Sequence, residues 1–332
     1  MSYETRQIRF GYAAQTTYGT AEVDGAAMAE VTCEPFDVDP DVLIHELPQN
    51  HGTRRPVEQS TVHSTQGSAC KFTVEGPVDL NDIDHFAYAH FQKAIEAVET
   101  EYTKTFNYFT IHPNFSANEG HYLTWIKRLP VASTSQKMGS CVASRFKLSA
   151  ERDGLLRYSI DFVGLGTTND TSNPSGTWTP RDGSDLVEFN DIASATLTHG
   201  AALASPTAIT MQSFEIEGNW EYDKVGHSAA NGFEELGIKN QTGSFKIKLL
   251  RDVTADEALV SLKTGELVKF SVDIGTITLV VTGKIESMEY DKEGLLVNSL
   301  SCSMKSSYSV SGVGECFTMT VANSIDRNWP AA

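Results

Sequence analysis

The stretch RDGLLRYSIDFVG, from Arg152 to Gly164, decides the fold class of this 332-residue chain. Its apolar residues alternate with polar or charged ones, which is the period of a β-strand with one buried face. A second stretch, KEGLLVNSLSCSM from Lys292 to Met304, has the same acidic-Gly-Leu-Leu turn followed by another alternating run. The same turn and strand occurring twice predicts an internal repeat.

Alternating apolar runs recur along the rest of the chain, so the sequence predicts a mainly-β protein. They are Phe72–Val74, Phe146–Ala150, Phe245–Leu249, Val268–Ile274, Ile277–Val281 and Phe317–Val321. Only two stretches have helical spacing. Asn81 to Thr100 places apolar residues three or four apart, and Thr254 to Gly265 begins with TADE, a capping-box pattern.

The landmarks follow the same order in both halves, which favours a tandem duplication. The first half reads QGSACKFTV (66–74), helix, DGLLRYSIDF; the second reads TGSFKIKLL (242–250), helix, EGLLVNSLSC. Between them lies a stretch rich in Gly, Ser, Thr, Asn and Pro, as in a linker. We therefore predict a first domain with an N-terminal arm at 1–165, a linker at 166–188 and a second domain at 189–332.

The charge of the chain limits its partners. Asp and Glu outnumber Lys and Arg by 43 to 26, and the formal net charge is -17. This excess argues against tight binding of nucleic acid or an anionic membrane. It is compatible with a polyanion that slides past the protein without binding. No apolar stretch has the length of a signal peptide or membrane span, so a cytosolic protein is expected.

No motif in the sequence carries recognisable chemistry. HELPQNH (His45 to His51) lacks the zinc-protease spacing and contains Pro48, and DVDPD (Asp37 to Asp41) departs from the calcium-loop pattern. The five cysteines are scattered without a C-x-x-C pair, which is typical of buried thiols. We predict no catalytic, cofactor-binding or metal-binding residue, no cofactor and no enzyme, although a hydrolase assembled from distant residues stays open.

Four stretches together resemble the two-domain tail tube proteins of long-tailed, non-contractile bacteriophages. They are GSCVASRFKLSAERDGLLRYSIDFVG (139–164), ITMQSFEIEGNWEYDKVG (209–226), TGSFKIKLL and FGYAAQTTYGTAE (10–22). That family closes its first domain with a Gly-Cys-type turn, a Gly-containing hairpin and a Val-Gly strand end. Its second domain opens with Ser-Phe-x-Ile and an Asn-containing turn, which Asn219 matches, whereas Trp220 and Tyr222 depart from the usual small polar residues.

The resemblance implies two tandem β-sandwich or barrel domains, each flanked by one α-helix. It also implies a structural virion protein whose trimeric, pseudo-hexameric rings stack into a tail tube, a conduit for DNA ejection. The implied partners are other copies of the chain and the tail terminator, tape measure and distal tail proteins. DNA would pass without specific binding, no membrane is involved, and the tail would be assembled in the host bacterial cytoplasm.

Two finer expectations concern surfaces of the tube. Alternating strands carrying Asp161 and Asp273 are expected to line an acidic lumen that keeps DNA from adhering. Axial contacts are expected from the arm Met1–Gly25, the loop at about Pro48–Gln66 and the insertion Ile111–Met138.

An alternative of another class is a virion or secreted ligand-binding β-sandwich, such as a lectin-like decoration or adhesion module. In that hypothesis Trp125 and Trp220 would line a sugar site. Polymerisation of the purified protein would favour the tube, and binding of a glycan would favour the ligand-binding module.

Overall fold

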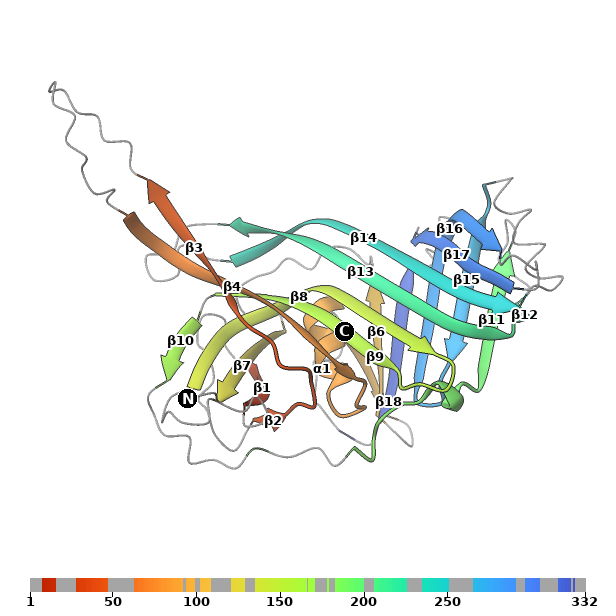
Figure 1. Ribbon diagram of the computed structural model, residues 1–332, viewed down its shortest axis with the longest axis horizontal. Helices are drawn as coiled ribbons and strands as arrows, with labels where there is room; N and C mark the ends of the chain where they lie inside the picture. The colour runs from red at the N-terminus through yellow and green to blue at the C-terminus, as the bar shows by residue number, and fades with distance from the viewer. Residues whose placement is uncertain are drawn as a thin grey trace, which may run out of the picture.

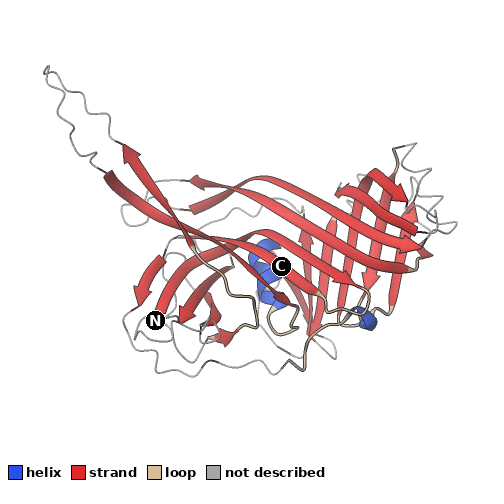
Figure 2. Cartoon of the chain, in the orientation of Figure 1, coloured by secondary structure: helices blue, strands red, loops and turns tan. Residues whose placement is uncertain are grey.

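The computed structural model describes a mainly-β molecule, which confirms the predicted fold class (Figure 2). The residues described are 8–15, 28–46, 63–91, 94–98, 102–108, 121–128, 135–165, 167–170, 178, 183–199, 206–225, 235–250, 265–290, 296–304, 316–323 and 325. The first half contains β1 (Arg9–Gln15), β2 (Ala29–Glu30), β3 (Asp39–Glu46), β4 (His63–Pro77), α1 (Ile83–Phe91), β5 (Ala94–Val98), β6 (Tyr102–Tyr108), β7 (Tyr122–Arg128), β8 (Ser135–Glu151), β9 (Arg157–Gly164) and β10 (Thr167–Asp170). The second contains the 3-10 helix η2 (Phe189–Asp191), β11 (Ser194–His199), β12 (Thr207–Ala208), β13 (Met211–Val225), β14 (Glu235–Leu250), β15 (Leu267–Asp273), β16 (Ile277–Tyr290), β17 (Leu296–Met304) and β18 (Phe317–Asn323).

The first predicted helix is shorter than the sequence suggested. Helix α1 ends at Phe91, and residues 94–98 of the expected helix form β5, which pairs with β6 from Ala94 opposite Phe106 to Val98 opposite Tyr102. Pairing with β6 outweighs the modest helix propensity of this segment. The second predicted helix, 254–265, lies outside the described residues except for Gly265.

One antiparallel sheet runs through both halves of the chain. Its strands pair in the order β3–β4–β9–β8–β13–β14–β17–β16, and we call it the main sheet. Figure 1 places β3 at the left end of the molecule and β16 and β17 at the right end. The junction between the halves is the pairing of β8 with β13, from Arg145 opposite Asn219 to Glu151 opposite Ser213.

A second layer covers part of the apolar face of the main sheet. Its strands pair in the order β5–β6–β18–β16–β15–β11–β12, so β16 belongs to both layers. In the first half, α1 packs against β8 and β6, and β1, β2, β7 and β10 form a small sheet with the first residues of β8. The largest fully buried side chains include Trp125, Phe86, Phe146, Phe245 and Phe270.

The four-strand unit β3–β4–β9–β8 recurs as β13–β14–β17–β16. The pairs Pro40–Cys70 and Ile44–Thr65 of the first hairpin correspond to Gly218–Gly243 and Tyr222–Ile238 of the second, and both hairpins shift register at the same place. A further register shift lies between Ala143 and Arg145 against β9, and between Ile285 and Ser287 against β17. Matching irregularities as well as matching order support a duplication.

The repeat differs in detail from the sequence comparison. Phe162 pairs with Phe72, and Cys302 pairs with Phe245, so the matched acidic-Gly-Leu-Leu turns precede equivalent strands. The match between Gly67 and Gly243, however, is three residues off, because Cys70 takes the place of Gly243. The corrected register also aligns PFDVDP (35–40) with SFEIEG (213–218), a similarity that the sequence analysis missed.

Two segments expected to project from the domain are partly core. Within the predicted arm Met1–Gly25, β1 pairs with β7 and buries Phe10 and Tyr12. Within the predicted insertion Ile111–Met138, β7 buries Trp125 completely. Deleting the whole arm would therefore remove a core strand. Of the predicted loop Pro48–Gln66, residues 48–62 lie outside the described part, and the rest belongs to β4.

The predicted linker 166–188 is bound to the first half where it is described. β10 pairs with β8, and the backbone N–H of Val187 donates to the carbonyl of Val78. Trp178 is fully buried against β1, and a Cβ atom on Gly11 would lie 3.0 Å from its ring, so the strand needs glycine there. The division at 166–188 stays a prediction.

A buried network around Lys104 joins the C-terminal strand to the first half. Lys104 on β6 lies 3.3 Å from Asp84 on α1, and both side chains are 0% exposed. The Lys104 ammonium also donates to Asn323 on β18 and to the carbonyl of Ile325. The amide of Asn323 in turn donates to the carbonyl of Leu80. This network and the pairing of β6 with β18 link the halves in the second layer.

We expect Lys104→Met to destabilise the protein by about 3–5 kcal/mol, because it leaves the Asp84 carboxylate buried without its counter-ion. The matched control is Arg152→Ala, which breaks an exposed ion pair with Asp153 at the surface and should cost about 1 kcal/mol or less. Denaturant unfolding monitored by tryptophan fluorescence measures both. Equal losses from the two variants would contradict the structural role of the buried pair.

His90 on α1 connects the helix with both halves of the main sheet. Its Nδ1 donates to the carbonyl of Ala143 at 3.0 Å, and the hydroxyl of Tyr222 on β13 donates to the same carbonyl at 3.3 Å. Burial lowers the pKa of His90 from 6.5 to about 3. The ring is therefore neutral in the folded protein at neutral pH.

Stability should fall as the pH drops from about 6.5 towards 3, because the unfolded chain binds a proton at His90 that the folded protein excludes. The slope for one such group is about 1.4 kcal/mol per pH unit. Between pH 6.5 and 4.5 the wild-type protein should thus lose about 2–3 kcal/mol more than His90→Gln. Free energies of unfolding at both pH values test this, and parallel losses in the two proteins would exclude His90 as the cause.

Candidate functional site

The main sheet has one polar face, opposite the face covered by α1 and the second layer. Alternation along each strand produces it, because Phe72, Ile160, Leu148, Ile216 and Ile247 turn into the core. Its members are Lys71, Thr73 and Glu75 on β4; Arg157, Ser159 and Asp161 on β9; Arg145, Lys147, Ser149 and Glu151 on β8; Ser213, Glu215, Glu217, Asn219 and Glu221 on β13; Ser244, Lys246 and Lys248 on β14; and Ser299, Ser301 and Ser303 on β17. We call this set the polar face.

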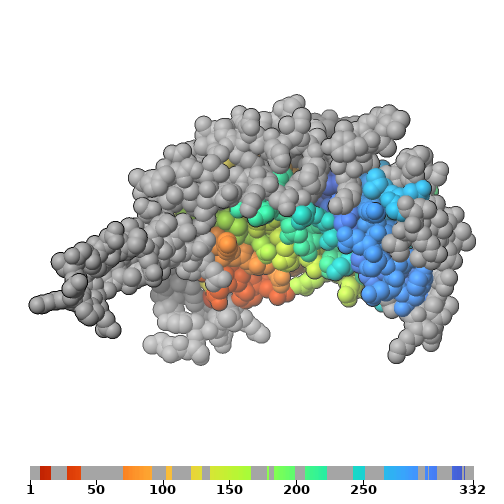
Figure 3. Space-filling model, turned by 90° about the horizontal axis from the view of Figure 1, so that it is seen from above, coloured from red at the N-terminus to blue at the C-terminus, as the bar shows by residue number. Residues whose placement is uncertain are grey.

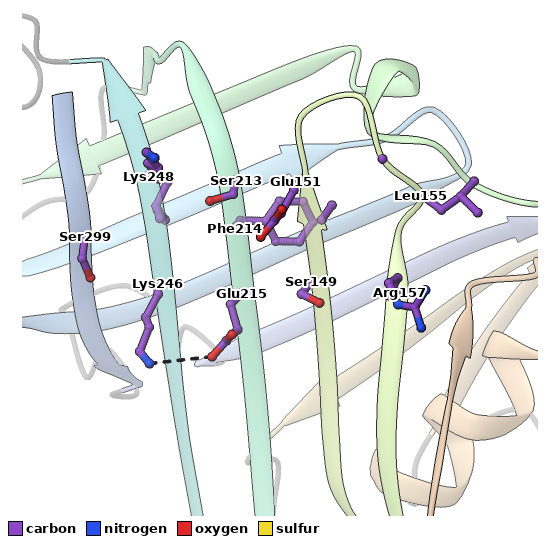
Figure 4. Close-up of a pocket in the computed structure, with 13 residues that line it drawn as sticks. Ser149, Glu151, Leu155, Arg157, Ser213, Phe214, Glu215, Lys246, Lys248 and Ser299 are labelled. Atoms are coloured by element: carbon purple, nitrogen blue, oxygen red, sulfur yellow. Dashed lines mark ion pairs between the residues drawn. The ribbon is translucent and has the colours of Figure 1, made fainter. Parts of the chain in front are cut away.

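Ion pairs cross the junction between the two halves. Glu215 on β13 lies between two lysines: its Oε2 is 2.8 Å from Lys147 Nζ on β8, and its Oε1 is 3.8 Å from Lys246 Nζ on β14. Figure 4 shows the pair formed with Lys246. Glu217 lies 3.9 Å from Arg145 Nε and accepts a hydrogen bond from Asn219. The acidic strand β13 thus pairs with a basic stretch of β8.

Within the first half, Asp161 gathers two donors. Arg145 Nη1 donates to its Oδ2 at 3.0 Å, and the hydroxyl of Thr73 donates to its Oδ1 at 2.7 Å. Arg145 Nη2 also donates to Ser159 at 3.2 Å. These contacts run across β4, β9 and β8, as cross-strand pairs do. The carboxylates of Asp161, Glu215 and Glu217, at the centre of the polar face, therefore each have a basic, amide or hydroxyl group as a partner.

Opposite charges balance on the five strands β4, β9, β8, β13 and β14. The basic members are Lys71, Arg145, Lys147, Arg157, Lys246 and Lys248, and the acidic ones are Glu75, Glu151, Asp161, Glu215, Glu217 and Glu221. The chain as a whole carries -17, so its acidic excess lies elsewhere. These five strands of the polar face are therefore not acidic, and the acidic lumen stays a prediction.

Asp161 and Asp273, whose strands were both expected to line the lumen, do not share a face of the molecule. Asp161 lies in the middle of the main sheet, whereas Asp273 ends β15 in the second layer. The Asp273 carboxylate accepts the backbone N–H of Gly275 at 3.0 Å and so caps a turn. The two carboxylates belong to different layers.

Two hollows open on the polar face. One of about 560 Å³ is lined by Glu215, Lys246, Lys248, Glu151 and Arg157, and Figure 4 draws their side chains. The other, of about 590 Å³, is lined by residues of β4, β9, β8 and β13, among them Asp161. In the space-filling view of Figure 3, the described residues form a continuous coloured band from first-half to second-half segments. A long surface covered with ion pairs is suited to contact with another molecule and offers no recognisable catalytic group.

The described residues contain no group of three or more His, Cys, Asp or Glu side chains able to hold a metal ion. The five cysteines are free thiols. Burial raises the pKa of Cys33 to about 12 and raises that of Cys141 strongly, so both stay protonated at neutral pH and are poor nucleophiles.

The remaining sequence candidates lie in structural positions. DVDPD continues into the extended strand β3, which also holds His45, while 47–51 of the HELPQNH stretch lies outside the described residues. Trp125 is fully buried, so its ring cannot line the expected sugar site, whereas Trp220 is 7% exposed and borders the hollow of about 590 Å³.

A comparison with family models decides the class of protein. The model described as phage tail tube protein matches residues 5–304 of the chain. The chain belongs to the phage tail tube protein family. A comparison with curated proteins gives no match. This tail tube protein is therefore a structural component of a virion tail, as its sequence resemblance implied. In the part of the tail tube protein that the structure describes, no helix is long and apolar enough to span a membrane.

Proposed function

We propose that three copies of this tail tube protein close into a ring with six similar positions, and that stacked rings form a tube through which DNA leaves the particle. The observation that carries the proposal is the repeated four-strand unit, whose second copy docks on the first through β13 and β8. A chain that contains two similar units fills two positions of a ring.

The docking of β13 on β8 predicts how neighbouring chains meet. In the second unit, β16 takes the place of β8, and residues 286–290 pair with β17 on one side but with no described strand on the other. In the first unit, β3 takes the place of β13 and pairs only with β4 among the described residues. These two edges lie at opposite ends of the molecule in Figure 1.

Copying the internal register gives the pairing between copies. Asn219 faces Arg145 and Gly218 faces Phe146 inside the chain. The equivalent residues place Asp41 of one copy opposite Ser287 of the next, and Pro40 opposite Met288. A closed ring of this kind removes both exposed edges, which stabilises a β-structure against uncontrolled pairing.

The polar face is then the surface that lines the lumen. The opposite face of the main sheet is covered by α1 and the second layer, which leaves the polar face open to a central channel. A surface with balanced, paired charges supports passage of DNA without specific binding. We further propose a non-contractile tail assembled in the host cytoplasm, contacts with terminator, tape measure and distal tail proteins, and no enzymatic activity.

Electron microscopy of the concentrated protein, alongside native particles, tests the ring. Rotational averages of end-on views should have three-fold symmetry with six similar lobes, because each chain supplies two similar units. Native tails that lack this chain would overturn the tube function. Rings of six chains would retain the function and overturn the stoichiometry.

Cysteine cross-linking tests the pairing between copies. Asp41→Cys combined with Ser287→Cys should give, on oxidation of assembled protein, a covalent ladder that ends at three chains, since facing Cβ atoms across antiparallel strands approach to about 4.5 Å, which small backbone motions bring within disulfide range. The internal pair Arg145→Cys with Asn219→Cys is the matched control and should cross-link within one chain.

Asp41→Cys combined with Glu286→Cys controls for the register and should cross-link less. Non-reducing gels separate the products, and each single variant reports background from native thiols. Rings visible by microscopy without a cross-link at 41 and 287 would overturn the register while leaving the ring intact.

A further inference from the structure

We infer that Glu215 and Asp161 act as internal counter-ions that prevent the basic residues of the polar face from binding DNA phosphates. This rests on the proposed function, because it concerns the polyanion that the polar face meets in the tube. The inference gives these two carboxylates a specificity role: they exclude DNA as a ligand of the wall.

The geometry of Glu215 carries the first part. One carboxylate faces Lys147 with one oxygen and Lys246 with the other, at 2.8 and 3.8 Å. The side chain of Lys246 is 55% exposed and that of Lys147 is 26% exposed, so both ammonium groups are within reach of a passing ligand. A single glutamate therefore occupies two cations that would otherwise present a doublet to phosphate.

Asp161 does the same for Arg145. The guanidinium donates to Asp161 and to Ser159, and its Nε lies near Glu217. A planar guanidinium is a strong bidentate partner of phosphate, and these contacts direct its donors sideways across the sheet. Thr73 holds the Asp161 carboxylate in place from the next strand.

Such exposed or half-exposed pairs contribute little to folding stability, typically about 0–1 kcal/mol each. Their effect on a polyanion is larger. Each lysine or arginine that reaches a phosphate releases a condensed counter-ion, and log K then changes with log salt by about 0.9 per contact for double-stranded DNA. Removing one carboxylate should therefore alter DNA binding more than it alters the fold.

The test compares Glu215→Gln with Glu151→Gln in binding of the purified full-length protein to a short DNA duplex. Glu151 is on the polar face and exposed, and the described residues offer it no ion pair. Both variants remove one negative charge, but only the first releases Lys147 and Lys246. Fluorescence anisotropy over a salt series gives the affinity and its salt dependence, and circular dichroism checks the fold.

We expect Glu215→Gln to raise DNA affinity about tenfold or more at low salt and to steepen the salt dependence by about two contacts, with Glu151→Gln near wild type. Asp161→Asn should also raise affinity. Adding Lys147→Met to Glu215→Gln should remove a large part of the gain. Equal gains from Glu215→Gln and Glu151→Gln would overturn the inference, because overall charge would then explain them, and so would no gain in either.

This experiment does not depend on assembly. A failure here with normal three-fold rings would reject the counter-ion role and leave the tube function standing. The converse result, DNA binding by Glu215→Gln but no tail location, would reject the proposed function.

Discussion

The antiparallel pairing of β13 with β8 is the interaction on which the rest of the structure depends. A sheet that ends in solvent exposes unpaired N–H and C=O groups and tends to pair with another chain. In this protein β13 of the second unit pairs with β8, so one edge of the first unit is covered within the same chain. Two edges stay exposed at opposite ends of the molecule. One is β3, the equivalent of β13, and the other is the end of β16, the equivalent of β8.

Closure of a ring requires more than complementary edges, because the angle between the two units must be fixed. A sheet joined through one strand pair could twist about that seam. Here the halves are joined again in the second layer, where β6 pairs with β18 and Lys104 reaches from Asp84 to Asn323. Tyr222 and His90 share the carbonyl of Ala143 beside the register shift in β8. Two separated seams resist rotation about either one.

Sequence patterns predicted several strands in which one face is uniformly apolar, such as β9 with Tyr158, Ile160 and Phe162. They failed where tertiary pairing decides the structure. The segment 94–98 has helix-forming residues but pairs with β6, and β1 mixes aromatic with small residues although Phe10 and Tyr12 are buried. The strand repeat at 35–40 was missed because prolines stand at both of its ends.

The candidate surface could have been found from charge alternation. Arg145 and Lys147 alternate with apolar residues on one strand, and Glu215 and Glu217 alternate on another, which is a signal for neighbouring strands of opposite charge. The net charge did not indicate this surface, because -17 describes the whole chain, whereas the acidic and basic residues of the polar face are equal in number. The distinction has a physical consequence. Fields from paired opposite charges cancel at distances beyond the pair, and salt screens the remainder within about 8–10 Å. In the proposed tube, a duplex near the axis would therefore meet a surface that neither repels nor binds it strongly, although the chain as a whole is strongly acidic.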